Sequence, residues 1–219
     1  MEGFNKKLSP SRAMHFTFTK QERHDLAKSW LLVSLAFTIF MTGLGLAPGF
    51  LETFLFALAV AAITVGIGFL AHELSHKWVA NNYGCYAEYH ANNAWLFISL
   101  LLSPFHVFLA APGAVHISGR PDHEQSGRIS LAGPAANFIL ALLFFILYFL
   151  LPAGMFREAA GIGTIINSSL ALFNLIPLGF FDGAKIIAWN KAWYGVALTL
   201  TIILTFFSYF FVQAGLGLF

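Results

Sequence analysis

Charged side chains are scarce in this chain. Only 10% of its 219 residues are Asp, Glu, Lys or Arg, whereas 58% are hydrophobic. A soluble domain carries about 25% charged residues, so this composition excludes an ordinary soluble protein. The sequence predicts an integral membrane protein that crosses the lipid bilayer several times.

Cysteine and clustered positive charge are also nearly absent. Cys85 is the single cysteine, which excludes an internal disulfide and a CxxC metal site. The net charge is only +2, and the basic residues form no patch interleaved with aromatic residues. We therefore expect no nucleic-acid partner.

Long apolar runs dominate what is present. A membrane-spanning helix needs about 20 residues, and most of the six runs are that long. The third run is the shortest and is interrupted by Pro104 and Pro112, which is typical of a segment that enters the membrane and returns. The predicted fold is an all-α polytopic membrane protein with about five to six transmembrane helices. The runs cover residues 28–48, 51–80, 94–112, 129–151, 159–181 and 193–218.

The distribution of Lys and Arg favours the re-entrant arrangement. These residues collect on the cytoplasmic side of membrane proteins. If the N-terminus is cytoplasmic and 94–112 is re-entrant, every one of the 12 Lys and Arg residues except Arg157 lies inside. A full crossing would instead move Arg120, Arg128, Lys185 and Lys191 outside. We therefore predict five full spans and a cytoplasmic N-terminus.

The chain divides into a tail and a membrane domain. Residues 1–27 are polar and basic, and Thr19–Glu22 has the spacing of a capping box. We expect this tail to contain a short amphipathic helix on the membrane surface. Residues 28–219 are predicted to form a single membrane-embedded domain.

The segment HELSH, residues 72–76, interrupts the second apolar run. His72 and His76 are four residues apart, so on a helix both imidazoles leave the same face and can bind one Zn²⁺. Glu73 lies beside them, where a carboxylate can take a proton from a zinc-bound water. The alternative is a polar patch that lines a transporter cavity or packs between helices.

A catalytic zinc needs a third protein ligand and an open position for water. Asp182 is the only acidic residue between Glu158 and the C-terminus. In the five-span topology, the run that precedes Asp182 crosses in the same direction as the run that carries the histidines. Asp182 is then at the membrane depth of His72 and His76, and the active-site end of the domain is cytoplasmic.

Two further motifs follow HELSH. GPAAN, residues 133–137, opens the fourth run, and NLIPLGFFDG covers residues 174–183. In this order the three motifs resemble the site-2 protease family, peptidase family M50, of intramembrane zinc metalloproteases. The resemblance implies one zinc per chain held by His72, His76 and Asp182, with Glu73 as the base. It also implies β-structure between residues 85 and 119. No PDZ or CBS module is recognisable in the sequence.

Asn137 and Asn174 lie in apolar surroundings, where an amide must find a partner. Hydrogen bonding between helices and a role in substrate positioning both remain open for them.

The predicted function is hydrolysis of peptide bonds within or near transmembrane segments of other membrane proteins. Such a substrate must unwind locally, and a strand edge near Ala114–Ile117 is a candidate to hold it by strand addition. The competing class is a non-catalytic membrane protein, either a metal transporter or a helix-binding pseudoprotease. The expected partners are a transmembrane protein substrate and the lipid bilayer, and the oligomeric state is left open.

Overall fold

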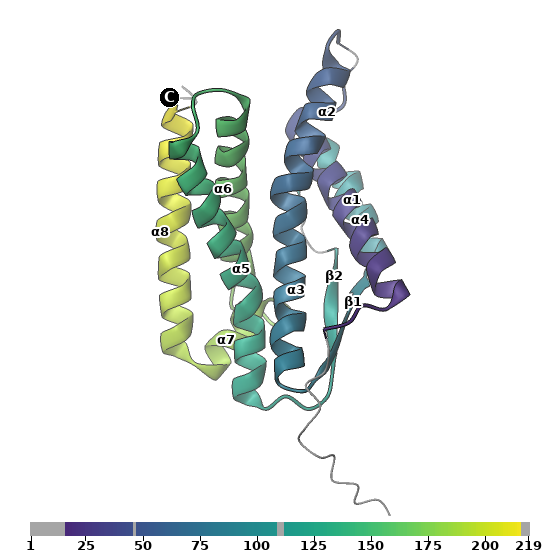
Figure 1. Ribbon diagram of the computed structural model, residues 1–219, viewed down its shortest axis with the longest axis vertical. Helices are drawn as coiled ribbons and strands as arrows, with labels where there is room; N and C mark the ends of the chain where they lie inside the picture. Colours follow the sequence, from purple (N-terminus) through teal and green to yellow (C-terminus); the bar gives the residue numbers. More distant parts are fainter. Residues whose placement is uncertain (1–15, 46, 109–111, 216–219) are drawn as a thin grey trace, which may run out of the picture.

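The computed structural model describes residues 16–45, 47–108 and 112–215, and it is mostly helical (Figure 1). The elements follow one another along the chain as α1 (Lys20–Thr42), α2 (Phe50–Ala61), the π-helix η1 (Ala62–Gly66), α3 (Ile67–Asn82), β1 (Tyr86–Ala91), α4 (Asn93–Leu102), the 3₁₀-helix η2 (Ser103–Phe105), β2 (Gly113–Ser118), α5 (His123–Leu150), α6 (Met155–Asn174), α7 (Asp182–Trp189) and α8 (Lys191–Gly215).

Four helices in the described part of the chain are long and apolar enough to cross a membrane. They cover Lys20–Thr42, Phe50–Asn82, His123–Leu150 and Lys191–Val212. The second of these is α2, η1 and α3 joined end to end. Helix α6 has 20 residues, which extend about 30 Å. It is less apolar because it contains polar residues such as Thr164, Asn167 and Ser168, all three of which are buried. The prediction of a polytopic α-helical membrane protein is confirmed.

The segment that follows α3 begins and ends with two strands that pair with each other. Strands β1 and β2 pair antiparallel, with Tyr86 opposite Ser118 and Ala91 opposite Gly113. Ala91 and Gly113, which precede and follow the intervening segment, are therefore neighbours, as a re-entrant segment requires. The predicted β-structure after HELSH is present, and re-entry of the segment into the membrane stays a prediction. Helix α4 within this segment has only 10 residues, about 15 Å, which is too short for a span.

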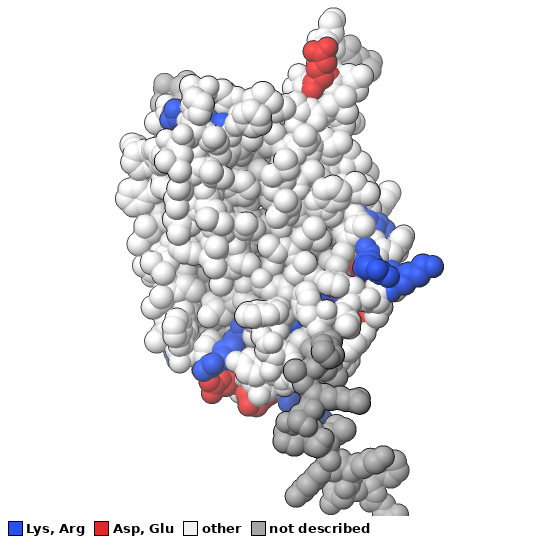
Figure 2. All heavy atoms as spheres, viewed as in Figure 1, with Lys and Arg blue, Asp and Glu red and all other residues white. Residues whose placement is uncertain are grey.

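The helices form two groups on either side of α3 (Figure 1). Helices α5, α6 and α8 pack together on one side, while α1, α4 and the β-hairpin lie on the other. The end of α3, the start of α5 and helix α7 all lie at the lower end of the view. Figure 2 shows charged side chains at this lower end and beside α1, whereas the broad face over α5 and α8 is uncharged between its ends.

Two helix boundaries differ from the prediction. The run expected over 159–181 ends as helix α6 at Asn174, and Asp182 is the first residue of the separate helix α7. Pro177 lies in the irregular stretch between these two helices, where it does not need to donate a backbone N–H.

At the N-terminus, Thr19 caps α1 by accepting a hydrogen bond from the backbone N–H of Glu22. Helix α1 then continues through Lys28 to Thr42 without interruption. The segment expected to form a short surface helix is therefore the beginning of α1, because Glu22 and Asp25 are buried against the hairpin. The rest of the predicted tail, residues 1–15, lies outside the described residues.

If the segment 92–112 is re-entrant, the starts of α5 and α8 lie on the same side of the membrane. In a C85A variant, the single cysteines D122C and K191C should react with a membrane-impermeant maleimide from the same side. A153C, in the connection between α5 and α6, should react from the opposite side. All three positions are exposed. Labelling of D122C and K191C from opposite sides would contradict the five-span arrangement.

Candidate metal centre

Three side chains from two distant parts of the chain converge at the lower end of α3. His72 and His76 project from one face of α3, and their Nε2 atoms are 3.0 Å apart. The Oδ2 atom of Asp182, at the start of α7, lies 3.3 Å from the Nε2 atom of His72 and 3.2 Å from that of His76. Both histidines are buried, and 14% of the Asp182 side chain is exposed.

This triangle has the dimensions of a tetrahedral zinc site. Bonds of about 2.0–2.1 Å at the tetrahedral angle separate neighbouring ligand atoms by about 3.3 Å. The three distances among His72, His76 and Asp182 are close to that value. Among the described residues, these three form the only group of His, Cys, Asp and Glu side chains close enough to share one ion. The residues therefore fit a three-ligand zinc centre with a fourth position open.

The hydrogen bonds behind the two imidazoles leave their Nε2 atoms free for a metal. The Nδ1 atom of His76 is 2.7 Å from the backbone carbonyl of Ile129, which can only accept. His76 therefore carries its proton on Nδ1. The Nδ1 atom of His72 is likewise 2.7 Å from Oδ1 of Asn137. Such partners fix the tautomer and the ring orientation of metal-binding histidines.

Asn137 is itself held on its other side. Its Nδ2 group donates to the backbone carbonyl of Gly68, at 2.9 Å, and to Oδ1 of Asn167, at 3.2 Å. Because the amide nitrogen is occupied by these acceptors, Oδ1 is the atom that faces His72. Asn137 thus links α5, α3 and α6 behind the candidate metal site.

The sequence left interhelical hydrogen bonding and substrate positioning open for Asn137. The geometry favours interhelical hydrogen bonding, and one of these bonds goes to His72. Sequence reasoning missed Asn167, which is fully buried in α6. An amide in the middle of an apolar run was the available signal, since such a group must find a partner.

Glycine at position 133 allows α5 to approach the ligand atoms. A Cβ atom there would lie 2.5 Å from Nε2 of His76 and 2.6 Å from Nε2 of His72. Any other residue would therefore overlap the space that a metal needs. The first glycine of the GPAAN motif thus has a steric explanation.

The candidate site opens into a cavity of about 230 Å³. Glu73 lines it and is 8% exposed. Asn174 also lines the cavity, but its amide nitrogen donates to the carbonyl of Leu170 in its own helix, at 3.0 Å. The remaining walls are mostly apolar and come from α1, η1, α3, β2, α5, α6, α7 and the loops next to them.

Comparison with known proteins identifies relatives of this chain. Peptidase family M50 matches residues 60–162, a range that includes HELSH and GPAAN. The "Putative zinc metalloprotease MJ0611" of Methanocaldococcus jannaschii is 36% identical over 189 residues, which are 84% of this chain and 93% of that protein. The chain belongs to peptidase family M50.

Other comparisons add less. The "Putative zinc metalloprotease YwhC" of Bacillus subtilis is 33% identical over 144 residues, which cover 57% of this chain and 66% of that protein. No solved structure matches the chain. The resemblance to the site-2 proteases is confirmed at the level of the family, and with it a metalloprotease class for this M50 member.

The lack of space for a Cβ atom at Gly133 predicts that a larger residue there abolishes metal binding. In G133A the added methyl group would occupy the space beside both Nε2 atoms, so the purified M50 protein should retain less than about a tenth of its zinc. G195A is the control, because a Cβ atom at Gly195 in α8 meets nothing within 4 Å. Elemental analysis after dialysis against a weak chelator measures both. Full zinc content in G133A would place the metal elsewhere.

The two asparagines should behave differently. N137L removes the acceptor from His72, and loss of such a partner typically weakens metal binding 10–100-fold. N174L should change zinc affinity less than about threefold, because Asn174 bonds to its own helix. Competition with a chromophoric chelator gives both affinities. Equal losses in the two variants would mean that Asn174 also supports a ligand.

Proposed function

We propose that this chain is an intramembrane zinc endopeptidase that hydrolyses peptide bonds within or near transmembrane segments of other membrane proteins. The observation that carries the proposal is the convergence of the His72, His76 and Asp182 ligand atoms beside Glu73, in a cavity among membrane-length helices. One zinc ion per chain would occupy this site. A zinc bound there would supply Lewis acidity and lower the pKa of a bound water.

Glu73 is the general base and acid of the proposed reaction. It accepts the proton of the attacking water and passes it to the nitrogen of the leaving amine. Its carboxylate is well suited to this role because it lies on the same helix as the two histidines but is not one of the three converging ligands.

The outer edge of β2 is the proposed binding place for the substrate backbone. In an antiparallel pair, alternate residues direct their N–H and C=O groups away from the partner strand. Tyr89 is one of these, since its N–H bonds outside the sheet. Its register partner Val115 and the equivalent residues Gly113 and Ile117 then direct their backbone groups outward from β2. All three line the cavity that contains Glu73.

A substrate segment that unwinds from its helix loses internal hydrogen bonds, which are costly to leave unsatisfied in a membrane. Strand addition to β2 would replace them next to the proposed base. The support for this assignment is therefore both geometric and energetic.

We assign the active-site end of the domain to the cytoplasmic side. Arg120, Arg128, Lys185 and Lys191 lie near the starts of α5, α7 and α8, at the same end as HELSH. Lys and Arg mark the cytoplasmic side. Labelling of D122C only after the cytoplasmic face is made accessible supports this orientation, whereas labelling in intact cells contradicts it.

The test of function is E73Q. Glutamine keeps the size of Glu73 but cannot act as the base, so the variant should retain zinc while cleavage of a reporter transmembrane helix falls by about 10²–10⁴-fold. E158Q, in the first turn of α6 at the opposite end, should cleave like the parent. A mass-spectrometric cleavage assay in detergent or liposomes measures all three proteins.

A metal transporter or a helix-binding scaffold needs no proton acceptor beside its metal. Cleavage by E73Q at the parent's rate, or no cleavage of any reporter by the zinc-loaded parent, would therefore refute the proposal.

A further inference from the structure

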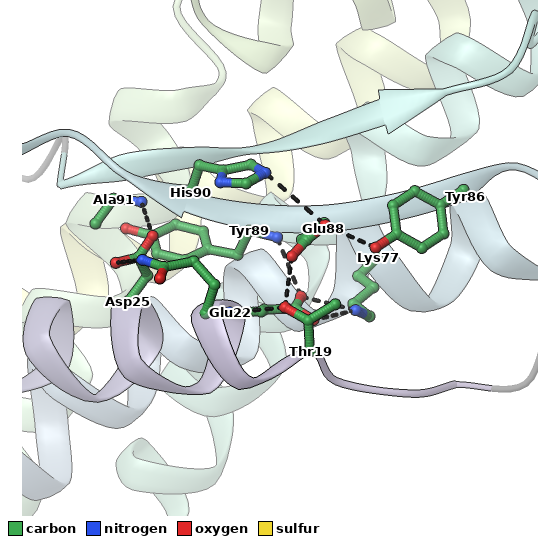
Figure 3. Close-up of polar contacts among 10 residues, drawn as sticks. Thr19, Glu22, Asp25, Lys77, Tyr86, Glu88, Tyr89, His90 and Ala91 are labelled. Carbon is green, nitrogen blue, oxygen red and sulfur yellow. Dashed lines mark hydrogen bonds and ion pairs between the residues drawn. The ribbon is translucent and has the colours of Figure 1, made fainter.

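The outer edge of β1 is closed by side chains of α1 (Figure 3). Oε1 of Glu22 accepts the backbone N–H of Tyr89 at 3.0 Å, and Oδ2 of Asp25 accepts the backbone N–H of Ala91 at 3.3 Å. Glu22 and Asp25 are three residues apart and so share one face of α1. Tyr89 and Ala91 are two apart and so point the same way from β1. The two carboxylates occupy the acceptor positions that a neighbouring strand would fill.

The same carboxylate ties the hairpin to the metal-binding helix. Lys77 follows His76 directly, and its Nζ atom is 2.7 Å from Oε1 and 2.5 Å from Oε2 of Glu22. Glu22 is fully buried and Lys77 is 2% exposed. Phe18 places its ring 4.8 Å from the Lys77 ammonium. One carboxylate thus bonds α3 and β1 at once.

Two contacts extend this attachment along the strand and into the re-entrant segment. The hydroxyl of Tyr89 donates to Oγ of Ser29, at 2.9 Å. Lys28 bridges Asp25, at 3.2 Å, to Oδ1 of Asn93 at the start of α4, at 2.8 Å. Helix α1 therefore holds the hairpin along most of β1.

A buried ion pair is a poor way to gain stability. Desolvation of both charges offsets most of their attraction, and apolar replacements of similar size are often neutral or stabilising. The pair between Glu22 and Lys77 therefore calls for another reason. The acceptor that Glu22 offers to the strand edge supplies one.

We propose that Glu22, Asp25 and Lys77 form an edge clamp that determines where and in what register a substrate strand binds. This inference rests on the proposed function. By closing β1, the clamp leaves β2 as the free edge of the described sheet. By fixing the hairpin to α3, it sets the distance between that edge and Glu73. Glu22 is in this sense a positioning residue, because it acts through β1 and Lys77 and is not among the residues that line the cavity.

The clamp should therefore control which bond is cut. If the hairpin moves relative to α3, a bound strand can shift along the site, and a shift by two residues presents a different bond with the same side-chain orientation. Loss of the clamp then weakens substrate binding and spreads cleavage over several bonds.

The experiment compares two double variants that both remove the buried charges. E22Q/K77M retains a side-chain oxygen that can accept from Tyr89, whereas E22L/K77M does not. Methionine replaces the unbranched stem of Lys77 in both. E124Q is the control, because it breaks the exposed ion pair between Glu124 and Arg128.

We expect E22Q/K77M and E124Q to match the parent within about twofold in KM and to cut the same bond. E22L/K77M should keep its zinc and a kcat near that of E22Q/K77M. Its KM should rise by about tenfold, the value of one lost hydrogen bond of about 1.4 kcal/mol, and products of neighbouring cuts should appear. Equal KM values and one identical cut in the two double variants would overturn the inference.

Hydrogen exchange measures the clamp without any catalysis. The peptide that contains Tyr89 and Ala91 should exchange at least about tenfold faster in E22L/K77M than in E22Q/K77M. Equal exchange overturns the clamp even if cleavage differs. If the parent cleaves no reporter, the proposed function fails, while the exchange data still decide whether the clamp exists. D25N and D25L form a second pair, which leaves Glu22 and Lys77 intact should E22L/K77M not fold.

Discussion

In a chain surrounded by lipid, every polar group buried between the helices must find its partner inside the protein. An unsatisfied group there costs several kcal/mol. Among the described residues, no buried side-chain nitrogen or oxygen lacks a hydrogen-bond partner. Asn137 and Asn167 bond to one another and to backbone carbonyls of the second span. The polar groups of the site are thus part of the structure that holds the helices together.

The requirement also explains why the site is assembled from segments far apart in sequence. A single helix can align two imidazoles, but it cannot satisfy their outer nitrogens as well. Helix α5 supplies these acceptors from Ile129 and Asn137, and α7 supplies Asp182. Gly133 allows α5 close enough for this arrangement. Each M50 motif is short because it contributes only a few side chains to the site. The site forms only when the helices that carry the motifs pack together.

Much of the fold and of the candidate site could be predicted from the sequence, because periodicity, proline and charge mark them. The positions of His72 and His76 follow from helical periodicity, and the return of the segment after α3 follows from Pro104, Pro112 and the distribution of positive charge. Asp182 was found because it is an isolated carboxylate in an apolar region. The position of Asp182 on a separate short helix could not be predicted, because the apolar composition changes little between Asn174 and Asp182.

The contacts of the hairpin could not be predicted. The pairing of Glu22 with Lys77 joins residues 55 apart, and no periodicity within either helix indicates it. In the sequence, Glu22 and Asp25 resemble ordinary polar residues of a tail. Their partners are backbone amides of β1, and the position of β1 is fixed by its pairing with β2. Interactions between a side chain and a distant backbone leave no pattern in the sequence.

The π-helix η1, between α2 and α3, has a mechanical consequence. A π turn contains one residue more than an α-helical turn, and each residue of an α-helix rotates the chain by about 100°. Residues 62–66 therefore set the angular phase of α3 independently of α2, and the indole of Trp30 bonds the carbonyl of Ala62 inside this turn. Shortening the segment by one residue would rotate His72 and His76 away from α5 while leaving the length of the span almost unchanged. The orientation of the half that carries His72 and His76 therefore depends on the π turn and not on the side chains of α2, whose sequence can vary without rotating these two histidines.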